Sequence, residues 1–337
     1  MFTLPPEANV QPLKKRRPAW VLVFAFLLAA VLLYFTLHGL DWATFWKTIT
    51  TGHYELILLV IPLASVNYFL RAVRWGTLVN AEKKVPLLSI FWANMVGYLG
   101  NAYLPARAGE LIRSVYLGEK SGAGTSFVFA TALVERLLDV IALVLIGSVS
   151  VLLQSQISSL LAGAIKIMAA AGVIGLVIII VMPFQEKLIL TLITRVPFPS
   201  KVSQKISEQV ARFLLGMRSL HNVRRLGVFI LLTAVIWLID GLGNMIGVHI
   251  ISQTLTLGQS LILLAALGLS SAVPTTPGYI GVYQFVAVNV LVPFGFSRPA
   301  ALAYILISQV INYLVISFWG LIGLWQVNRT QLKKGNV

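Results

Sequence analysis

Two short segments, one in each half of the chain, place proline, glycine and polar residues within strongly apolar sequence. The first surrounds Pro105 and Gly109, and the second surrounds Pro274 and Gly278. The two prolines lie 169 residues apart, about half of the 337-residue chain. Proline removes a backbone donor, and inside a bilayer the freed backbone groups must be satisfied by protein or by a watery cavity. Matched interruptions in two halves indicate the binding site of a membrane transporter.

Charged residues follow the first proline at regular spacing. Arg107, Glu110 and Arg113 are three residues apart and would form a stripe along one side of a helix. Buried arginine normally faces a bundle interior or a cavity and finds a partner there. We predict that Arg107 and Arg113 hold a phosphate bidentately while Glu110 orients one of them. The alternative is a set of structural ion pairs near the cytoplasmic interface.

A second charged cluster consists of Glu135, Arg136 and Asp139. Glu135 and Asp139 share a helix face, and Arg136 reaches Asp139 at the i, i+3 spacing. We favour a structural role, in which one of the carboxylates neutralises Arg107 or Arg113 across helices. Transport of a coupling proton is the alternative. Asp240 stands alone in its apolar run, and the spacing names no partner for it.

Two further polar groups belong to the candidate site. Arg71 and Arg74 share a face beside Trp75, either as anchors that snorkel to the interface or as groups that capture a headgroup. The second interrupted region has no charge between Gln253 and Pro293 and suits a phosphate or a sugar-like group. Helices that begin after Pro105 and Pro277 would point backbone amides at an anion such as a lipid phosphate. The polar residues of this second region are Ser270, Ser271, Thr275, Thr276, Tyr279, Tyr283 and Gln284.

The composition requires a membrane to solvate this chain. Hydrophobic residues make up 58% and charged residues 11%, about half of the charge of a soluble domain. The mean hydropathy is +0.87, and several apolar runs reach the roughly 20 residues that are needed to cross a bilayer. There is no cysteine, the four histidines lack metal-ligand spacing, and no phosphate-binding G-x-x-x-x-G-K-[ST] motif occurs, so no metal or other cofactor is predicted.

The elements that position these residues are predicted to be helices. We expect full spans near residues 19–37, 55–70, 125–153, 157–182, 226–251 and 300–327, and broken hairpins near 87–117 and 257–292. The expected fold is therefore an all-α polytopic membrane protein with about six full transmembrane helices and two re-entrant hairpins in an inverted repeat. Full crossings in place of re-entrant hairpins preserve the same sidedness and stay open.

The net charge of +15 gives the orientation. With the N-terminus inside, 20 of the 26 Lys and Arg residues fall in or beside cytoplasmic segments, as the positive-inside rule requires, so nucleic acid is not an expected partner. Residues 39–54 are expected to form a short external aromatic loop. Residues 203–220 are expected to form an amphipathic helix on the membrane surface, with a solvated loop helix as the alternative. The chain divides into a basic N-terminus (1–17), a first membrane half (18–182), a basic cytoplasmic insert (183–225), a second membrane half (226–328) and a cytoplasmic tail (329–337).

Four motifs in order carry a family resemblance. They are Arg-x-x-Arg-Trp at 71–75, Asn-x-x-x-Pro-x-Arg-x-Gly-Glu from Asn101 to Glu110, Glu-Arg-x-x-Asp at 135–139, and Pro-Gly-x-x-Gly from Pro277 to Gly281. Over residues 15–328 the chain resembles the transmembrane region of bacterial lysylphosphatidylglycerol synthases, a flippase-like family. Tyr279 and Gln284 stand where that family often has glycine and glutamate.

The resemblance implies a function in lipid transport. In the synthases this region is taken to move aminoacylated phosphatidylglycerol between leaflets, beside a soluble transferase domain that the sequence does not show, so lysine transfer is not expected. Relatives without that domain are associated with lipids, polyprenyl-linked sugars or hopanoids. We predict translocation of an anionic phospholipid, aminoacyl-phospholipid or polyprenyl or glycolipid across the inner membrane, with membrane lipids as ligands. The alternatives are a lipid-modifying membrane enzyme, or an accessory partner of a separate lipid-glycosylating or lipid-aminoacylating enzyme.

Overall fold

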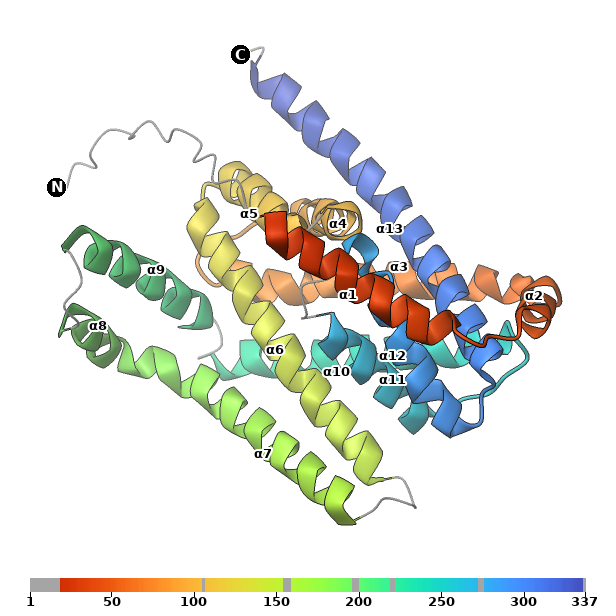
Figure 1. Cartoon of the computed structure of the whole chain (residues 1–337). Helices are drawn as coiled ribbons and strands as arrows, with labels where there is room; N and C mark the ends of the chain where they lie inside the picture. Colours follow the sequence, from red (N-terminus) through yellow and green to blue (C-terminus); the bar gives the residue numbers. More distant parts are fainter. Residues whose placement is uncertain are drawn as a thin grey trace.

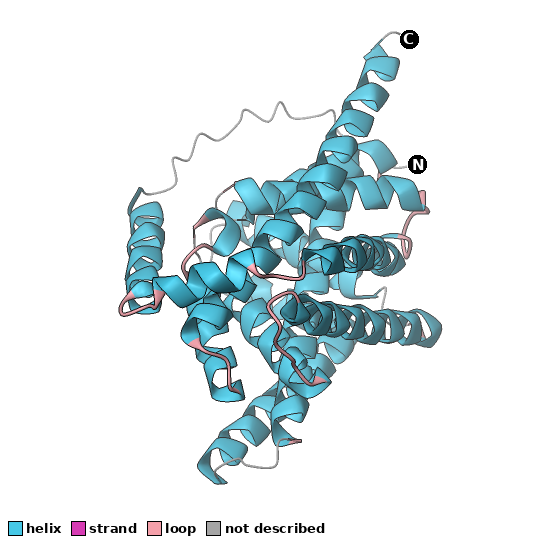
Figure 2. Ribbon diagram, turned by 90° about the vertical axis from the view of Figure 1, so that its right-hand side faces the viewer, coloured by secondary structure: helices cyan, strands magenta, loops and turns pink. Residues whose placement is uncertain are grey.

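The computed structural model describes residues 19–104, 107–153, 159–195, 200–218, 222–271 and 276–335. Within these ranges every regular element is a helix, so the all-α prediction is confirmed (Figure 1). Six helices have 19 residues or more and belong to the membrane halves: α1 (Ala19–Leu37), α3 (Ile57–Val79), α6 (Thr125–Leu152), α7 (Ser159–Val181), α10 (Val223–His249) and α13 (Arg298–Gly335). The C-terminal part of α13 projects from the bundle in both ribbon views (Figure 2).

Among the described residues, four helical stretches are long and apolar enough to cross a membrane. They are Tyr54–Val79, Val223–His249, Pro277–Phe294 and Arg298–Val327. A fifth span results if α1 and the following helix α2 (Trp42–Thr50), which are bent by 92° relative to each other, count as one. α6 has 28 residues but carries the cluster Glu135, Arg136 and Asp139, which needs protein partners rather than lipid.

Each predicted broken hairpin is a pair of helices joined at the proline segment. α4 (Leu87–Tyr103) packs against α5 (Ala108–Ser121), and α11 (Leu257–Ser270) packs against α12 (Val282–Leu291). A short 3-10 turn, η5 (Pro277–Tyr279), precedes α12. These arms have 10 to 17 residues, which fits the re-entrant geometry, whereas the 18 apolar residues of Pro277–Phe294 also suffice for a crossing.

Each half of the chain packs one arm of its broken hairpin on a long helix of the other half. α4 of the first half packs on α13 of the second, and α11 of the second half packs on α6 of the first. α3 and α10 pack together at the centre, where Asn67 donates to the Ile236 carbonyl and Arg71 pairs with Asp240. Both contacts join residues 169 positions apart, the same offset as the two prolines. Because residues beside a two-fold axis contact their own counterparts, a pseudo-two-fold axis passes between α3 and α10.

The two matched glycines serve different purposes. A Cβ on Gly109 would lie 1.8 Å from the Gly97 carbonyl oxygen, so only glycine allows α5 to approach α4 this closely. Gly278 has a φ of +72°, which favours glycine, and a Cβ there would meet the Tyr313 hydroxyl. The sequence match therefore reflects close helix packing in one half and a left-handed turn in the other.

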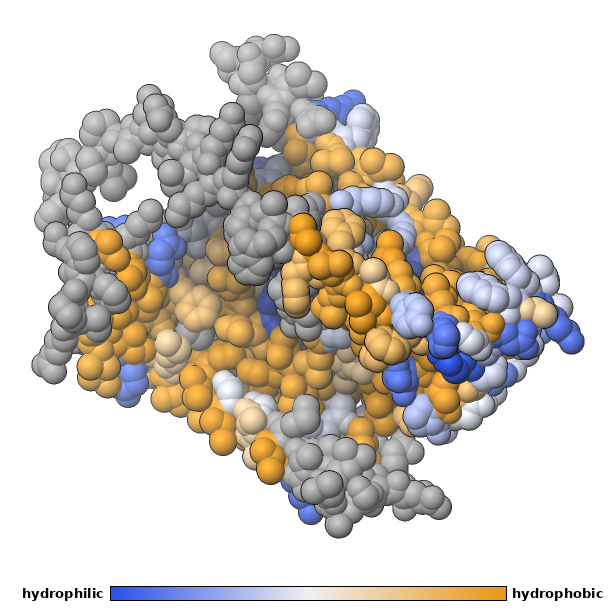
Figure 3. All heavy atoms as spheres, in the orientation of Figure 1, coloured by the Kyte–Doolittle hydropathy of each residue, from blue (hydrophilic) through white to orange (hydrophobic). Residues whose placement is uncertain are grey.

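The surface has an extended apolar face and a polar end. Figure 3 shows hydrophobic residues over most of the visible side and hydrophilic residues gathered at the end that bears α2. The segment 39–54 was expected to be a loop, but residues 42–50 within it form the helix α2. Asp41 caps this helix by accepting from the Thr44 amide. Trp42 and Trp46 on this helix are exposed, as in an interfacial belt.

The basic insert forms two amphipathic helices. The helix expected at 203–220 is confirmed as α9 (Ser200–Arg218), which packs on α6. A second helix, α8 (Glu186–Arg195), precedes it and was missed because it is only 10 residues long. Figure 1 shows α8 at one end of α7 and α9 beside α6.

Candidate functional site

A buried ion-pair network lies between α3, α5 and α6. Glu135 is the bridge, because it accepts from Arg74 at 3.0 Å and from Arg113 at 3.1 Å. Arg74 also holds both carboxylate oxygens of Asp139, at 2.6 and 3.0 Å. Arg74, Arg113 and Glu135 are each 1% exposed. Charges buried this deeply persist only when they are paired.

The network continues toward the centre of the bundle through Glu110 and Arg136. Glu110 forms ion pairs with Arg113 and with Arg136, each with an N···O distance of 2.6 Å, and Asn101 donates to it at 3.2 Å. Arg136 also lies 3.8 Å from Asp139. Three guanidinium groups therefore face three carboxylates, and the network is neutral as a whole.

This arrangement corrects two expectations. Arg74 is not an interfacial anchor, because α3 continues beyond it to Val79 and the buried Arg74 side chain pairs with carboxylates on α6. Arg113 and Arg107 do not form one phosphate clamp, because Arg113 is buried, pairs with Glu110 and Glu135, and donates to the side-chain oxygen of Asn94. The structural role favoured for Glu135 and Asp139 fits these contacts.

A cavity of about 320 Å³ lies beside the network, at the centre of the pseudo-symmetric bundle. Arg71, Arg107 and Arg136 reach its wall, while Asp240 is its one carboxylate among the described residues. Asp240 pairs with Arg71 at 2.5 Å, which supplies the partner that the sequence did not reveal. The remaining polar wall is formed by amide and hydroxyl groups: Asn67, Tyr68, Tyr98, Asn101, Asn244, Ser271, Tyr279, Tyr283, Ser308, Gln309, Asn312 and Tyr313.

Arg107 connects the two broken hairpins across this cavity. Its backbone is left-handed, with φ of +53°, so its side chain leaves the helical stripe expected with Glu110 and Arg113. The guanidinium donates to the Ser271 hydroxyl at 2.7 Å and lies 5.9 Å from the Tyr279 ring. Tyr279 is itself left-handed, with φ of +60°, and stacks on Tyr283. Left-handed non-glycine residues are strained and cluster at functional sites, and here one comes from each break.

The second hairpin satisfies its own backbone. The Gln284 side chain accepts from the Gly281 amide at 2.7 Å and so caps α12. The Gly278 carbonyl accepts from Gln309 at 3.2 Å and from the Tyr313 hydroxyl. Thr276 donates to the Ile280 carbonyl at 2.8 Å. Because Gln284 accepts from the amide of Gly281, the N-cap residue of α12, the expectation that this helix points free amides at an anion is wrong at that position.

The predicted site residues thus separate into three groups. Arg71, Asn101, Arg107, Arg136 and Ser271 line the cavity. Arg74, Glu110, Arg113, Glu135 and Asp139 form the network behind it, and Thr276, Pro277, Gly278, Gly281 and Gln284 build the second break. Pro105 and Thr275 lie outside the described residues.

Sequence reasoning missed the polar residues that unbroken helices bring to the cavity. Asn244 on α10 lies four residues after Asp240, and Asn312 on α13 lies four residues after Ser308. This spacing puts each pair on one helix face, so polar pairs within otherwise apolar spans were the available signal.

The whole of this arrangement lies within a recognised sequence family. Residues 22–320 match the family model described as the lysylphosphatidylglycerol synthase transmembrane region. The chain belongs to this family. It is also 27% identical over 296 residues to the UPF0104 membrane protein PH1989 of Pyrococcus horikoshii, covering 81% of this chain and 86% of that protein. The UPF0104 membrane protein MJ1078 of Methanocaldococcus jannaschii is 25% identical over 240 residues, covering 69% of this chain and 96% of that protein. The family and the apolar helices identify a multi-pass membrane protein.

Proposed function

We propose that this protein moves a lipid with an anionic phosphate headgroup between the leaflets of the inner membrane. The observation that carries the proposal is the positive charge of Arg107 at the cavity wall, because the two other arginines there are already paired, Arg71 with Asp240 and Arg136 with Glu110. Arg107 forms no ion pair with a described residue and is held only by Ser271 and the Tyr279 ring. A guanidinium held by a neutral partner in a membrane is suited to bind a phosphate.

The position of the cavity supports transport rather than simple binding. It lies where the two broken hairpins meet and where α3 and α10 cross the pseudo-two-fold axis, the usual place of a transporter site. The headgroup would pass through the polar cavity while its tails stay among the exposed apolar residues of the bundle. We place both termini on the cytoplasmic side, because α8 and α9 carry basic residues whereas the α2 end carries exposed tryptophans.

The carboxylates favour transport over catalysis. Glu110, Glu135 and Asp139, the clustered candidates for acid–base chemistry, are each held by two arginines. The proposal therefore includes no chemical step, and any change to the headgroup falls to a separate lipid-modifying enzyme.

The test is lipid movement in liposomes that contain the purified protein. Fluorescent phosphatidylglycerol in the inner leaflet is protected from a membrane-impermeant reductant until a protein carries it outward. We expect protein-dependent loss of this protection, measured with and without a transmembrane pH or sodium gradient. Arg107→Gln should slow it about 10- to 100-fold, because a hydrogen bond to a charged group contributes about 1.5–3 kcal/mol.

Arg298→Gln is the matched control. Arg298 at the start of α13 donates to the Phe35 carbonyl and is not part of the cavity wall, so its loss should leave the rate unchanged. Equal rates for Arg107→Gln and the wild-type protein would remove Arg107 from the site. A chemically altered lipid in extracts of the liposomes would favour the enzyme, and no movement of any anionic lipid under any gradient would refute transport.

A further inference from the structure

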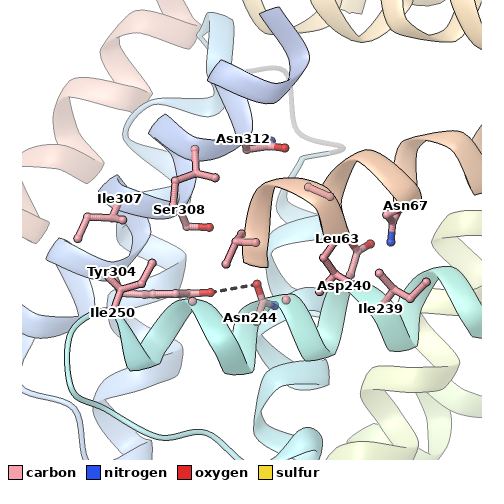
Figure 4. A pocket seen from close by; sticks show the side chains of 15 residues that line it. Leu63, Asn67, Ile239, Asp240, Asn244, Ile250, Tyr304, Ile307, Ser308 and Asn312 are labelled. Atoms are coloured by element: carbon pink, nitrogen blue, oxygen red, sulfur yellow. Dashed lines mark hydrogen bonds between the residues drawn. The ribbon is translucent and has the colours of Figure 1, made fainter. Parts of the chain in front are cut away.

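A second cavity, of about 110 Å³, adjoins the arginine-lined one between α3, α10 and α13. Figure 4 shows its lining side chains, with Asn67 from α3, Asp240 and Asn244 from α10, and Tyr304, Ser308 and Asn312 from α13. All of these except Tyr304 also belong to the wall of the first cavity, so the two spaces share one polar strip. No arginine or lysine reaches the second cavity among the described residues.

The hydrogen-bonding capacity of this strip is only partly used. The Tyr304 hydroxyl donates to the Asn244 Oδ1 at 3.0 Å, while the Asn244 Nδ2 is buried and has no partner among the described residues. The Asn312 Oδ1 accepts from Tyr68, which leaves its Nδ2 to face the cavity. Asp240 uses Oδ2 for Arg71, so its Oδ1 is an acceptor. The strip therefore offers amide donors beside a carboxylate acceptor and the Ser308 hydroxyl, which does both.

This mixture selects among the groups of a lipid head. A second phosphate only accepts hydrogen bonds and would meet the Asp240 carboxylate without an arginine to compensate. An ammonium only donates and would meet the amide donors of Asn244 and Asn312. A hydroxyl group donates and accepts, so a group with several hydroxyls satisfies donors and acceptors together. The apolar remainder of the wall, which includes Leu63, also suits the C–H face of a sugar ring.

From these contacts we infer that the transported lipid carries a hydroxyl-rich headgroup, a sugar or a polyol, beyond its phosphate. The phosphate binds the arginines of the first cavity, and the hydroxyl groups bind Asn244, Ser308 and Asn312 in the second. The inference rests on the proposed function and adds the class of headgroup to it.

The experiment compares two fluorescent lipids with the same tails in the liposome assay. Phosphatidylinositol has a polyol beyond its phosphate, and phosphatidic acid has the phosphate alone. We expect the wild-type protein to move phosphatidylinositol about tenfold faster than phosphatidic acid, and Asn244→Ala to bring the ratio of the two rates close to one. Tenfold corresponds to about 1.4 kcal/mol. A hexosyl polyprenyl phosphate and the bare polyprenyl phosphate, tested in the same way, distinguish a sugar from a polyol.

Two variants complete the design. Ser308→Ala removes one hydroxyl from the same strip and should lower the preference for phosphatidylinositol in the same direction as Asn244→Ala. Either variant can therefore test the site if the other folds less well. Asn289→Ala on α12 is the matched control, because Asn289 is exposed and donates only to its own helix at Phe285. Equal wild-type rates for both lipids, or equal loss of both in Asn244→Ala and Ser308→Ala, would overturn the hydroxyl-binding site while transport stands. Absence of all transport would instead refute the proposed function.

Discussion

Removal of a single charge from the buried network should destabilise the protein severely, and Arg74→Met is the sharpest case. Arg74 is 1% exposed and faces two carboxylates, Glu135 and Asp139. Two unit charges about 4 Å apart attract by about 4 kcal/mol at an effective dielectric constant of about 20. Much of this attraction offsets the desolvation of the guanidinium, but deleting one partner leaves a buried charge uncompensated. We expect the free energy of unfolding to fall by about 3–5 kcal/mol.

The double variant Arg74→Met/Asp139→Leu separates charge balance from packing. It removes one cation and one carboxylate, so Arg113 and Arg136 still face Glu110 and Glu135. Because a buried ion pair replaced by apolar groups is often neutral or stabilising, the double variant should unfold within about 1 kcal/mol of the wild-type protein. The measurement is equilibrium unfolding in mixed micelles with increasing sodium dodecyl sulfate, followed by tryptophan fluorescence.

Arg218→Gln provides the control for an exposed pair. Arg218 pairs with Glu186, but its side chain is 51% exposed, so its loss should cost at most about 1 kcal/mol. The reasoning fails if the double variant is as unstable as Arg74→Met, or if Arg74→Met unfolds like Arg218→Gln.

Two further predictions concern the hairpin contact and the central ion pair. Gly109→Ala should destabilise the protein by at least about 1–3 kcal/mol, because its Cβ would lie 1.8 Å from the Gly97 carbonyl oxygen. Gly227→Ala in α10 is the control and should not destabilise it, because the new Cβ would meet open space. Equal unfolding midpoints for the two variants would contradict this account. Asp240→Arg should abolish folding or transport, because it places two arginines together. The exchange Arg71→Asp/Asp240→Arg should recover folded protein in detergent, as judged by gel filtration. If the exchange fails to recover it, the pair is not interchangeable about the axis.

Local patterns predicted the elements well where the deciding interactions are local. The apolar run at 19–37 became α1 with the same bounds, and the proline segments marked both hairpins. The second span was expected to end at Leu70, because Arg71 and Arg74 look interfacial, yet α3 continues to Val79. Their charges are compensated by Asp240, Glu135 and Asp139, which lie 61 to 169 residues away in sequence. Spacing along one helix cannot reveal a partner on another.

The candidate site was predicted by residue type more than by geometry. Arg107, Glu110 and Arg113 were placed on one stripe, which assumes helical backbone at all three. The left-handed φ of Arg107 rotates it out of that stripe and toward the second hairpin. A left-handed arginine is uncommon, and here the side chain of Arg107 is held by Ser271 and the Tyr279 ring from the second hairpin. The contact with Ser271 therefore explains why Arg107 reaches across the cavity, whereas Arg113 stays in the buried network.

The central pair also explains why the two halves match in glycine and proline but not in charge. Arg71 and Asp240 occupy equivalent positions beside the pseudo-two-fold axis, so each is the other's nearest counterpart. If both halves carried arginine there, two like charges would face each other inside the membrane, and two aspartates would repel equally. Equivalent positions at the axis must therefore diverge to opposite or neutral residues, whereas prolines and glycines that shape the breaks face no such constraint. Once the centre is asymmetric, the ionic network can form in the first half and the hydroxyl-rich break in the second without weakening the shared scaffold.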